Sequence, residues 1–487
     1  MRPHAAVALA TVLVLAGCSA IPGVQDPEPI TPAVGTPEGT PGERETATPW
    51  TPADTPTTPA EDDDQGPTID SVGWHGGYWA NASLGVRLTD GLTADERAAL
   101  VARTVARVEA VRGVDYDGRL NVSVRRSPAD WPAVDGATRR YRDAMYEALF
   151  LVGSDRDGTT AYRESLLARG VWYEAATDSV VFAADAAPES ELAVTRAVAR
   201  AFQAQAHGPA PAGPLSDAER ARTALDAGAA RLTVADYSGR CGEDWTCAGS
   251  VDAQPPCARL DRVDSGLFLL DCYAPVDGYV HVLSAARAGG WDAVDALYDD
   301  PPNSTAAVTG MDAGPPESVA LPVTGGDGWS HVPAPGSGTV GPAAIAVPIQ
   351  YSYFAGYSES TVAPDLFVNL AGGRANATDP LAYALPPADG WRGDRLRVYR
   401  DGSDSGFVWR STWANGSEAA EFRFWYAYLL RYWGGEQVER EGGRELWRLP
   451  PESPFAGAVS VRVDGATVTV VRGPERSDLV SLAPPDV

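Results

Sequence analysis

The sequence contains no lysine, so arginine supplies every strongly basic side chain. Acidic residues outnumber the arginines by 65 to 39, and the formal net charge is −26. Binding to nucleic acid needs clustered basic side chains, so a surface this acidic argues against a nucleic-acid partner. Such a surface suits concentrated salt, because salt screens the repulsion between like charges.

Histidine is also scarce, and no two histidines have the spacing of metal ligands on one helix. We expect His207, at the end of a predicted helix, to interact with the helix dipole rather than with metal. Two serine-containing segments, 356–360 and 403–406, differ from the G-x-S-x-G pattern of hydrolases, and no histidine follows either one. The sequence therefore predicts no cofactor, metal site or catalytic residue. The five histidines are His4, His75, His207, His281 and His331.

Four of the five cysteines lie within one span, and Cys18 stands apart. An even, clustered set in an exported protein favours two disulfides, for which three pairings are possible. Pairing of near neighbours would join Cys241 to Cys247 and Cys257 to Cys272. The alternative is a zinc site with four thiolate ligands, but the spacings match no zinc-ribbon or zinc-finger pattern.

Residues 1–18 have the pattern of a secretory signal peptide. Arg2 precedes an apolar run, Ala5 to Ala16, that is short for a bilayer span. The run ends in Leu15-Ala16-Gly17-Cys18, which resembles a lipoprotein lipobox. The resemblance implies that Cys18 carries a lipid and holds the protein at the extracellular face of the cell membrane. The alternative is an ordinary signal peptide with a chance cysteine.

Residues 19–66 are mostly Pro, Thr, Gly, Ala, Glu and Asp, and Trp50 is their single aromatic residue. Such a segment cannot bury enough apolar surface to fold, so we expect a disordered tether. Five N-x-S/T sequons follow the tether, and their chemistry fits a surface glycoprotein, although chance accounts for some of them. They are at Asn81, Asn121, Asn303, Asn376 and Asn415.

From residue 67 the pattern predicts an α+β fold in three parts: 67–310, an irregular connecting region 311–389, and a C-terminal α+β unit 390–487. Capping boxes at Thr93–Glu96 and Ser216–Glu219 predict two helix starts. Further helices are predicted near 139–151, 279–298 (with a break at Gly289-Gly290-Trp291) and 418–433. Strands are predicted at 120–124, 171–182 (a hairpin), 395–399, 407–413, 459–463 and 467–471. The aromatic face of helix 418–433 is expected to be core.

The segment Glu191–Gly208 predicts a helix with two different faces. A buried stripe at helical spacing is expected for Val194, Ala197, Val198, Ala201 and Phe202. Four polar residues fall on the opposite side, also at helical spacing: Arg196, Arg200, Gln203 and His207.

The stretch Arg196–Gln205, RAVARAFQAQ, is similar to the central helix of a group of exported zincin-like proteins. That helix reads His-Glu-x-x-His-Ala-Leu-Gln-Asp-Gln, and its second half is partly kept here. The resemblance extends from about residue 139 over well over half of the chain, and it implies a zincin-like domain over 67–310. It also includes the hairpin 171–182, Gly228, Gly289-Gly290-Trp291, Ser304-Thr305 and Gly390–Asp394. The acidic, lysine-free composition is similar to that of haloarchaeal proteins.

The residues that perform zincin chemistry are replaced. In an active zincin two histidines at i and i+4 bind zinc, and the glutamate activates a water. Here Arg196 and Arg200 stand at the histidine positions, and Ala197 stands at the glutamate position. The third ligand position in the resemblance is Ala227, just before Gly228. Arginine stays protonated and offers no lone pair to a metal, so the departures argue against zincin chemistry.

Two functional hypotheses follow. The first is a lipid-anchored cell-surface protein with an inactive zincin-like domain and a binding or envelope role. Its partners would be membrane lipid, through Cys18, and other envelope proteins. The second is a secreted hydrolase with a non-standard active site. Arg196 and Arg200 could also bind a carboxylate or another anion, although a solvated or salt-bridged pair is the commoner case.

Overall fold

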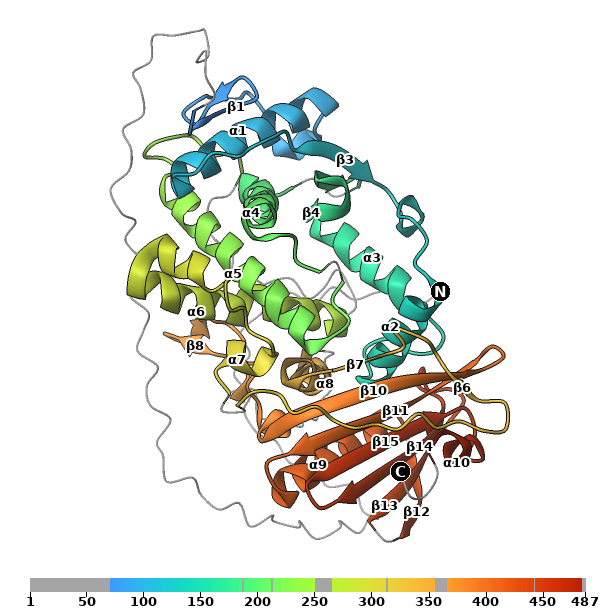
Figure 1. Cartoon of the computed structure of the whole chain (residues 1–487). Coiled ribbons are helices and arrows are strands. Elements are labelled where there is room, and N and C mark those ends of the chain that lie inside the picture. Colours follow the sequence, from blue (N-terminus) through green and yellow to red (C-terminus); the bar gives the residue numbers. More distant parts are fainter. Residues whose placement is uncertain are drawn as a thin grey trace, which may run out of the picture. The chain divides into compact units, whose positions relative to one another are not determined.

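The computed structural model describes residues 71–483 except 186–187, 212, 250–264, 312–313, 355–365 and 442 (Figure 1). Cys18, the tether and Cys257 lie outside these residues, so the predictions for them stay predictions. The fold is α+β, as predicted: a helical N-terminal region with small sheets precedes a C-terminal antiparallel sheet. No helix in these described ranges is long and apolar enough to cross a membrane.

Helix α1 (Ala94–Arg112) begins and ends at local signals. The Thr93 hydroxyl accepts a bond from the Glu96 N–H group, and the Glu96 carboxylate accepts one from the Thr93 N–H group, which confirms the predicted capping box. The helix ends at Gly113, whose φ of 68° is the left-handed conformation that favours glycine. Its predicted inward residues are all buried: Leu100, Val101, Val105 and Val108.

Two small sheets accompany this helix. Strands β1 (Trp74–His75) and β2 (Tyr78–Trp79) form an antiparallel pair against α1. The second sheet has three strands, with β5 in the centre, parallel to β3 and antiparallel to β4. The antiparallel pair of β4 and β5 confirms the predicted hairpin. The strands are β3 (Asn121–Arg125), β4 (Val171–Glu174) and β5 (Ser179–Ala183).

Two helices lie between β3 and β4 in the chain. Helix α2 (Gly136–Ala148) begins before the predicted residue 139, because Asp135 accepts bonds from the N–H groups of residues 137 and 138. The periodicity does not predict α3 (Gly158–Arg169), although Asp157 caps it in the same way.

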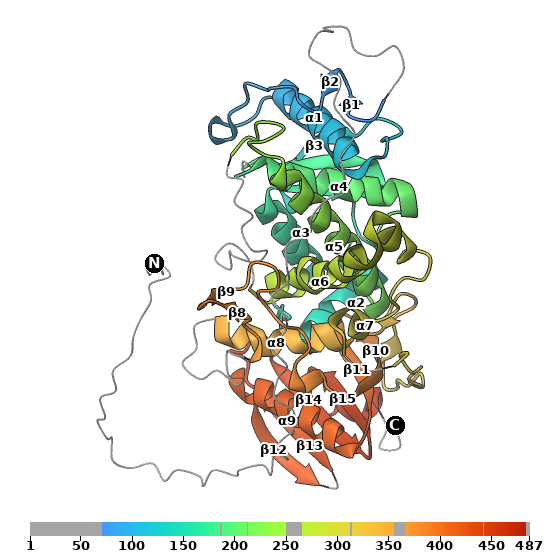
Figure 2. The same cartoon turned by 90° about the vertical axis from the view of Figure 1, so that its left-hand side faces the viewer.

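Three long helices follow in succession, and the second, α5, packs against both the first and the third (Figure 2). Helix α5 starts at the predicted capping box of Ser216 and Glu219. Helix α6 begins before the predicted residue 279, and its predicted break occurs at Gly289 and Gly290, where the backbone leaves the helical conformation. The three are α4 (Glu191–His207), α5 (Asp217–Gly239) and α6 (Ser265–Ala296).

Helices α5 and α6 meet with their backbones almost in contact. A Cβ at Gly228 would lie 2.1 Å from the Gly278 carbonyl oxygen, and a Cβ at Gly278 would lie 2.1 Å from the Ala224 carbonyl oxygen. Only hydrogen fits at these two positions, so the two glycines set the distance between the helices.

The expectation of an irregular region over 311–389 is incomplete, because α8 (Pro342–Phe354) lies within it. Residues 343–347 are buried on every side, so α8 has no polar face from which a helical period could be recognised. Asp394 accepts bonds from the Val340 and Gly341 N–H groups at 2.6 and 2.8 Å, immediately before α8. A carboxylate of the C-terminal sheet thus caps a helix that precedes the sheet.

The C-terminal sheet is antiparallel, in the order β12-β13-β14-β15-β11-β10-β6, with β7 also paired to β10. All four predicted strands occur in it. The sequence pattern does not predict β6, β7, β12 or β13. The strands are β6 (Ser330–His331), β7 (Ser337–Gly338), β10 (Trp391–Asp401), β11 (Asp404–Trp413), β12 (Glu436–Glu441), β13 (Arg444–Leu449), β14 (Gly457–Asp464) and β15 (Thr467–Gly473).

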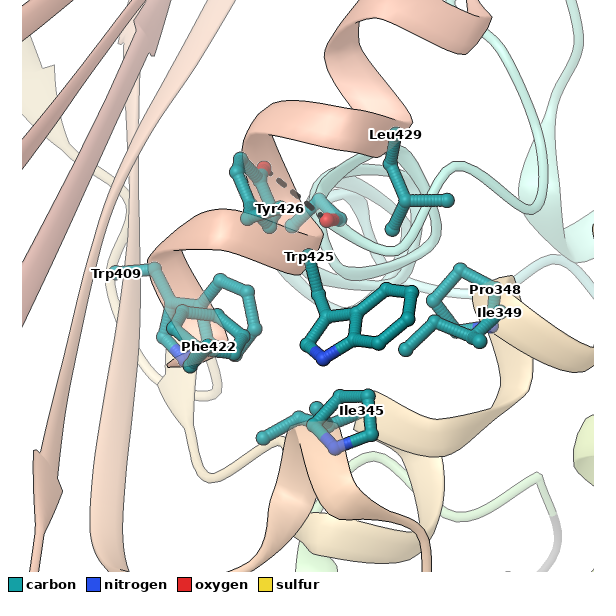
Figure 3. Close-up of a pocket in the computed structure, with 10 residues that line it drawn as sticks. Ile345, Pro348, Ile349, Trp409, Phe422, Trp425, Tyr426 and Leu429 are labelled. Atoms are coloured by element: carbon teal, nitrogen blue, oxygen red, sulfur yellow. Dashed lines mark hydrogen bonds between the residues drawn. The ribbon is translucent and has the colours of Figure 1, made fainter. Parts of the chain in front are cut away.

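The aromatic stripe of α9 (Gly416–Tyr432) is core, as predicted. Figure 3 shows Phe422, Trp425 and Tyr426 of α9 among Trp409 of β11 and residues of α8. The space left between them measures about 10 Å³, roughly the volume that one water requires. This face of α9 therefore offers no room for a ligand.

Candidate functional site

The N-terminus of α4 is fixed by a buried ion network. Glu191 is fully buried, and its two carboxylate oxygens each lie 2.8 Å from a guanidinium, one of Arg103 and one of Arg107. The Tyr237 hydroxyl and the Ala248 N–H group also donate to this carboxylate. Glu191 therefore joins α4 to α1, α5 and the loop that follows α5.

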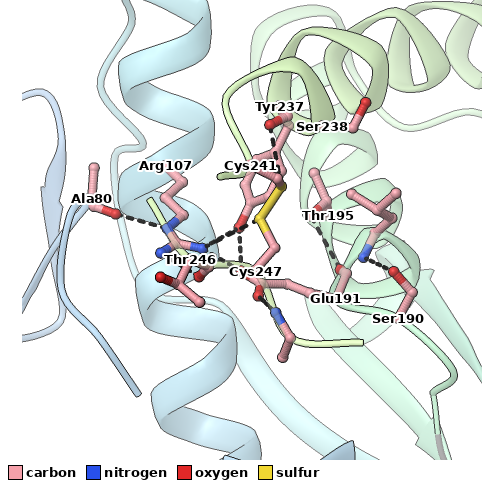
Figure 4. Close-up of a disulfide and its surroundings, with 12 residues drawn as sticks. Ala80, Arg107, Ser190, Glu191, Thr195, Tyr237, Ser238, Cys241, Thr246 and Cys247 are labelled. Atoms are coloured by element: carbon pink, nitrogen blue, oxygen red, sulfur yellow. Dashed lines mark hydrogen bonds and ion pairs between the residues drawn. A yellow bond between two sulfur atoms is a disulfide. The ribbon is translucent and has the colours of Figure 1, made fainter. Parts of the chain in front are cut away.

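That loop is closed by the disulfide between Cys241 and Cys247, which confirms the first predicted bridge. Arg107 extends from α1 toward the bridge and also donates to the Thr246 carbonyl oxygen at 3.1 Å (Figure 4). The second predicted bridge, between Cys257 and Cys272, stays a prediction because Cys257 lies outside the described residues.

The ion network around Glu191 is not predicted in the sequence analysis, although the sequence of α1 contains an indication of it. Arg103 and Arg107 stand four residues apart on α1 and continue its apolar face, and both are buried. Two arginines on the inner face of a helix require a buried counter-charge. Glu191, which is 84 residues beyond Arg107 in the chain, supplies that counter-charge.

The apolar face of α4 is buried as predicted, but the polar face is narrower than expected. Gln203 is only 1% exposed, so its predicted place on an outer basic face is wrong. Arg112 of α1 packs there and donates to the Gln203 side-chain oxygen at 3.4 Å. His207 is stacked on Tyr298, with ring centroids 3.9 Å apart, and lies 3.3 Å from an Asp295 carboxylate oxygen.

The remaining polar face consists of Arg196, which is exposed, and Arg200, which is half-buried. Neither guanidinium has a hydrogen-bond or ion-pair partner among the residues that the structure describes. Arginines elsewhere in this acidic chain commonly contact carboxylates, as Arg125 does with Glu174 at 2.7 Å. We call Arg196 and Arg200 the α4 arginine pair.

Other cations surround the α4 arginine pair. Desolvation lowers the pKa of Arg196, and the positive charges of Arg169 and Arg200 lower that pKa further. Burial lowers the pKa of Arg231 on α5 to about 10, and the charge of Arg196 adds to the fall. Arg196 is exposed, and the charges of Arg169 and Arg200 place its guanidinium in a positive field.

Part of this positive charge is neutralised nearby. Arg169, at the end of α3, pairs with Asp271 of α6. Arg222 pairs with Asp226 on α5 at 3.3 Å, and the pKa of Asp226 is raised by burial but lowered by Arg200 and Arg222. Asp271 is paired with Arg169, and Asp226 attracts both Arg222 and Arg200, so Arg196 is the member of the pair with the stronger remaining attraction for an anion.

The residues at the positions of the zincin ligands and of the zincin general base do not fit a metal site. Ala197 and Ala227 are 2% and 5% exposed and carry no donor atom, and arginine has no free lone pair. Within the described ranges, no group of three or more His, Cys, Asp or Glu side chains is placed to hold a metal ion. Arg196, Arg200, Ala197 and Ala227 therefore supply no ligand atom for a metal.

The predicted glycosylation sites are on or near the surface. Asn81, Asn121, Asn303 and Asn415 are exposed, whereas Asn376 is half-buried. Two of them also have structural roles. Asn415 caps α9 by accepting bonds from the Ser417 and Glu418 N–H groups, and Asn121 donates to the Thr177 carbonyl oxygen.

Comparison with known proteins adds one finding. A family described as "Domain of unknown function (DUF8575)" matches residues 331–483, which include the C-terminal sheet and α8. No curated protein and no solved structure matches the chain. The α4 arginine pair lies outside the matched residues.

Proposed function

We propose that the protein is a lipid-anchored cell-surface protein with a zincin-like domain that lacks zincin catalysis. Its α4 arginine pair binds an anionic ligand, and carboxylate is a group that guanidiniums bind through paired hydrogen bonds. The observation that carries the proposal is that neither Arg196 nor Arg200 has a hydrogen-bond or ion-pair partner among the described residues, in a chain with 65 acidic residues.

The electrostatic surroundings support this proposal. The positive charge of Arg196 interacts with those of Arg169, Arg200 and Arg231. Their mutual repulsion raises the free energy of the site when no anion is bound. A bound carboxylate would offset the repulsion and accept bidentate hydrogen bonds.

Two observations support the zincin-like assignment. Helix α4 follows the β4–β5 hairpin and packs directly on α5, so Arg196, Arg200 and Ala227 come from consecutive packed helices. Gly228, which is part of the resemblance, lies at the closest approach of α5 to α6. The surface location is supported by the lipobox at Cys18 and by a disulfide, which is typical of exported proteins.

The test is a calorimetric titration of the purified full chain with citrate at constant ionic strength. Exchange of both residues, Arg196→Gln with Arg200→Gln, is expected to weaken citrate binding by at least about tenfold, because hydrogen bonds to charged groups contribute about 1.5–3 kcal/mol each. Arg119→Gln is the matched control, since Arg119 is also exposed and lies on a different part of the chain.

Thermal unfolding of each variant establishes that it is folded before its affinity is compared. Equal citrate affinity in the wild type and the folded double variant would contradict the proposal. So would an equal loss of affinity in the Arg119→Gln control.

A further inference from the structure

A large cavity lies away from α4, between α2 and one end of the C-terminal sheet. Its volume is about 860 Å³, within the range of about 300–1,000 Å³ that is usual for ligand sites. Its walls come from α2, the segment 153–156, the β10–β11 turn, β13 and the chain after β15. No residue of α4 contributes to it.

The inner wall is built from a buried ion pair. Arg472 is 7% exposed and lies 2.5 Å from a Glu147 carboxylate oxygen. Arg472 also donates to the carbonyl oxygens of Ser405 and Ala456 at 3.0 and 2.8 Å. Burial raises the pKa of Glu147, and the charge of Arg472 opposes that rise. These contacts hold the wall rigid, so its polar groups do not need to be ordered when a ligand binds.

The rim has side chains of both signs, of which Arg448, Asp404 and Glu475 are exposed and Arg140 is half-buried. Arg140 and Arg448 supply guanidiniums, and Asp404 and Glu475 supply carboxylates. None of these four side chains has a hydrogen-bond or ion-pair partner within the described part of the chain. Hydrogen-bond donors and acceptors are therefore available together around one opening.

The mixture of positive and negative side chains around the cavity indicates the chemical class of the ligand. Five arginines and four carboxylates line the cavity, so their charges nearly cancel and favour neither a strongly anionic nor a strongly cationic ligand. Hydroxyl groups both donate and accept, so a neutral polyhydroxylated ligand can use every rim side chain. Val438, which is 50% exposed, adds an apolar contact for the C–H groups of such a ligand. We infer that the cavity binds a neutral oligosaccharide.

The test is calorimetry on the full chain with three neutral tetrasaccharides: maltotetraose, cellotetraose and xylotetraose. Tetragalacturonate is the acidic comparison. At least one neutral tetrasaccharide is expected to bind. Arg140→Gln with Arg448→Gln, and separately Asp404→Asn with Glu475→Gln, should each weaken that binding by about tenfold or more.

The controls separate this site from the α4 arginine pair. Arg196→Gln with Arg200→Gln, and Arg119→Gln alone, should leave saccharide affinity unchanged, and thermal unfolding verifies that every variant is folded. The inference is overturned if no neutral tetrasaccharide binds at millimolar concentration. It is also overturned if tetragalacturonate binds more tightly than all three, or if neither rim variant changes the affinity.

Discussion

Glu191 is the residue on which the placement of α4 depends most. Its carboxylate neutralises Arg103 and Arg107, and all three side chains are at least 98% buried. Glu191→Gln would leave two buried arginines without a counter-charge. We expect a loss of about 3–5 kcal/mol in the free energy of unfolding, measured by urea denaturation. Glu243→Gln, at an exposed position, should change it by less than about 0.5 kcal/mol. A loss below about 1 kcal/mol for Glu191→Gln would contradict the assigned role.

Asp394 makes stability depend on pH. Burial raises its pKa from 3.8 to about 6, and three N–H groups, those of Val340, Gly341 and the Trp391 indole, donate to it and limit the rise. A raised folded-state pKa means that its contribution to stability is complete below about pH 4. That contribution is lost as the pH rises through about 6.

Asp394→Asn should therefore change its effect with pH. Between pH 4 and pH 7 the wild type should lose roughly 3 kcal/mol of unfolding free energy that the variant keeps, because each pKa unit corresponds to about 1.4 kcal/mol. The difference between the variant and the wild type should therefore rise with pH. Urea denaturation at fixed salt measures this difference. A constant difference would show that the Asp394 carboxyl ionises normally in the folded state, and a falling one that its pKa is lowered; either result would contradict a raised pKa.

At the scale of elements, the α5–α6 contact is the most sharply constrained. Gly228→Ala would place a methyl group against the Gly278 backbone, and we expect a loss of about 1–3 kcal/mol from overpacking. Gly239→Ala is the matched control, because no atom lies within 4 Å of a Cβ at that end of α5. It should be neutral or stabilise by up to about 1 kcal/mol. Equal effects of the two changes on the melting temperature would contradict the close approach.

Elements with local signals could be predicted from the sequence. Helices α1 and α5 begin at capping boxes, and the hairpin and the α9 stripe have clear periods, so their positions follow from neighbouring residues. Helix α8 has no polar face, and the charged strand β12 (EQVERE) lies at a sheet edge, where charge is common. The sequence pattern therefore does not identify α8 as a helix or β12 as a strand.

The α4 arginine pair and the cavity beside α2 could not be predicted fully from the sequence pattern. The positions of Arg196 and Arg200 on one face of α4 followed from helical spacing, but their lack of partners depends on how α3, α5 and α6 pack. The burial of Gln203 depends on Arg112 of another helix. The cavity joins Glu147 to Arg472, which are more than 300 residues apart in the chain. Such long-range pairings are fixed only by the complete fold.

For the whole molecule, we propose that α4 has a zincin-like arrangement in which arginines stand at the positions of the metal ligands. Zinc content tests it most directly. The full chain would be equilibrated with zinc, dialysed and analysed by mass spectrometry for metal per chain, beside a peptidase assay with and without chelator. The account predicts zinc far below one ion per chain. One zinc per chain, or peptidase turnover that the chelator abolishes, would contradict it.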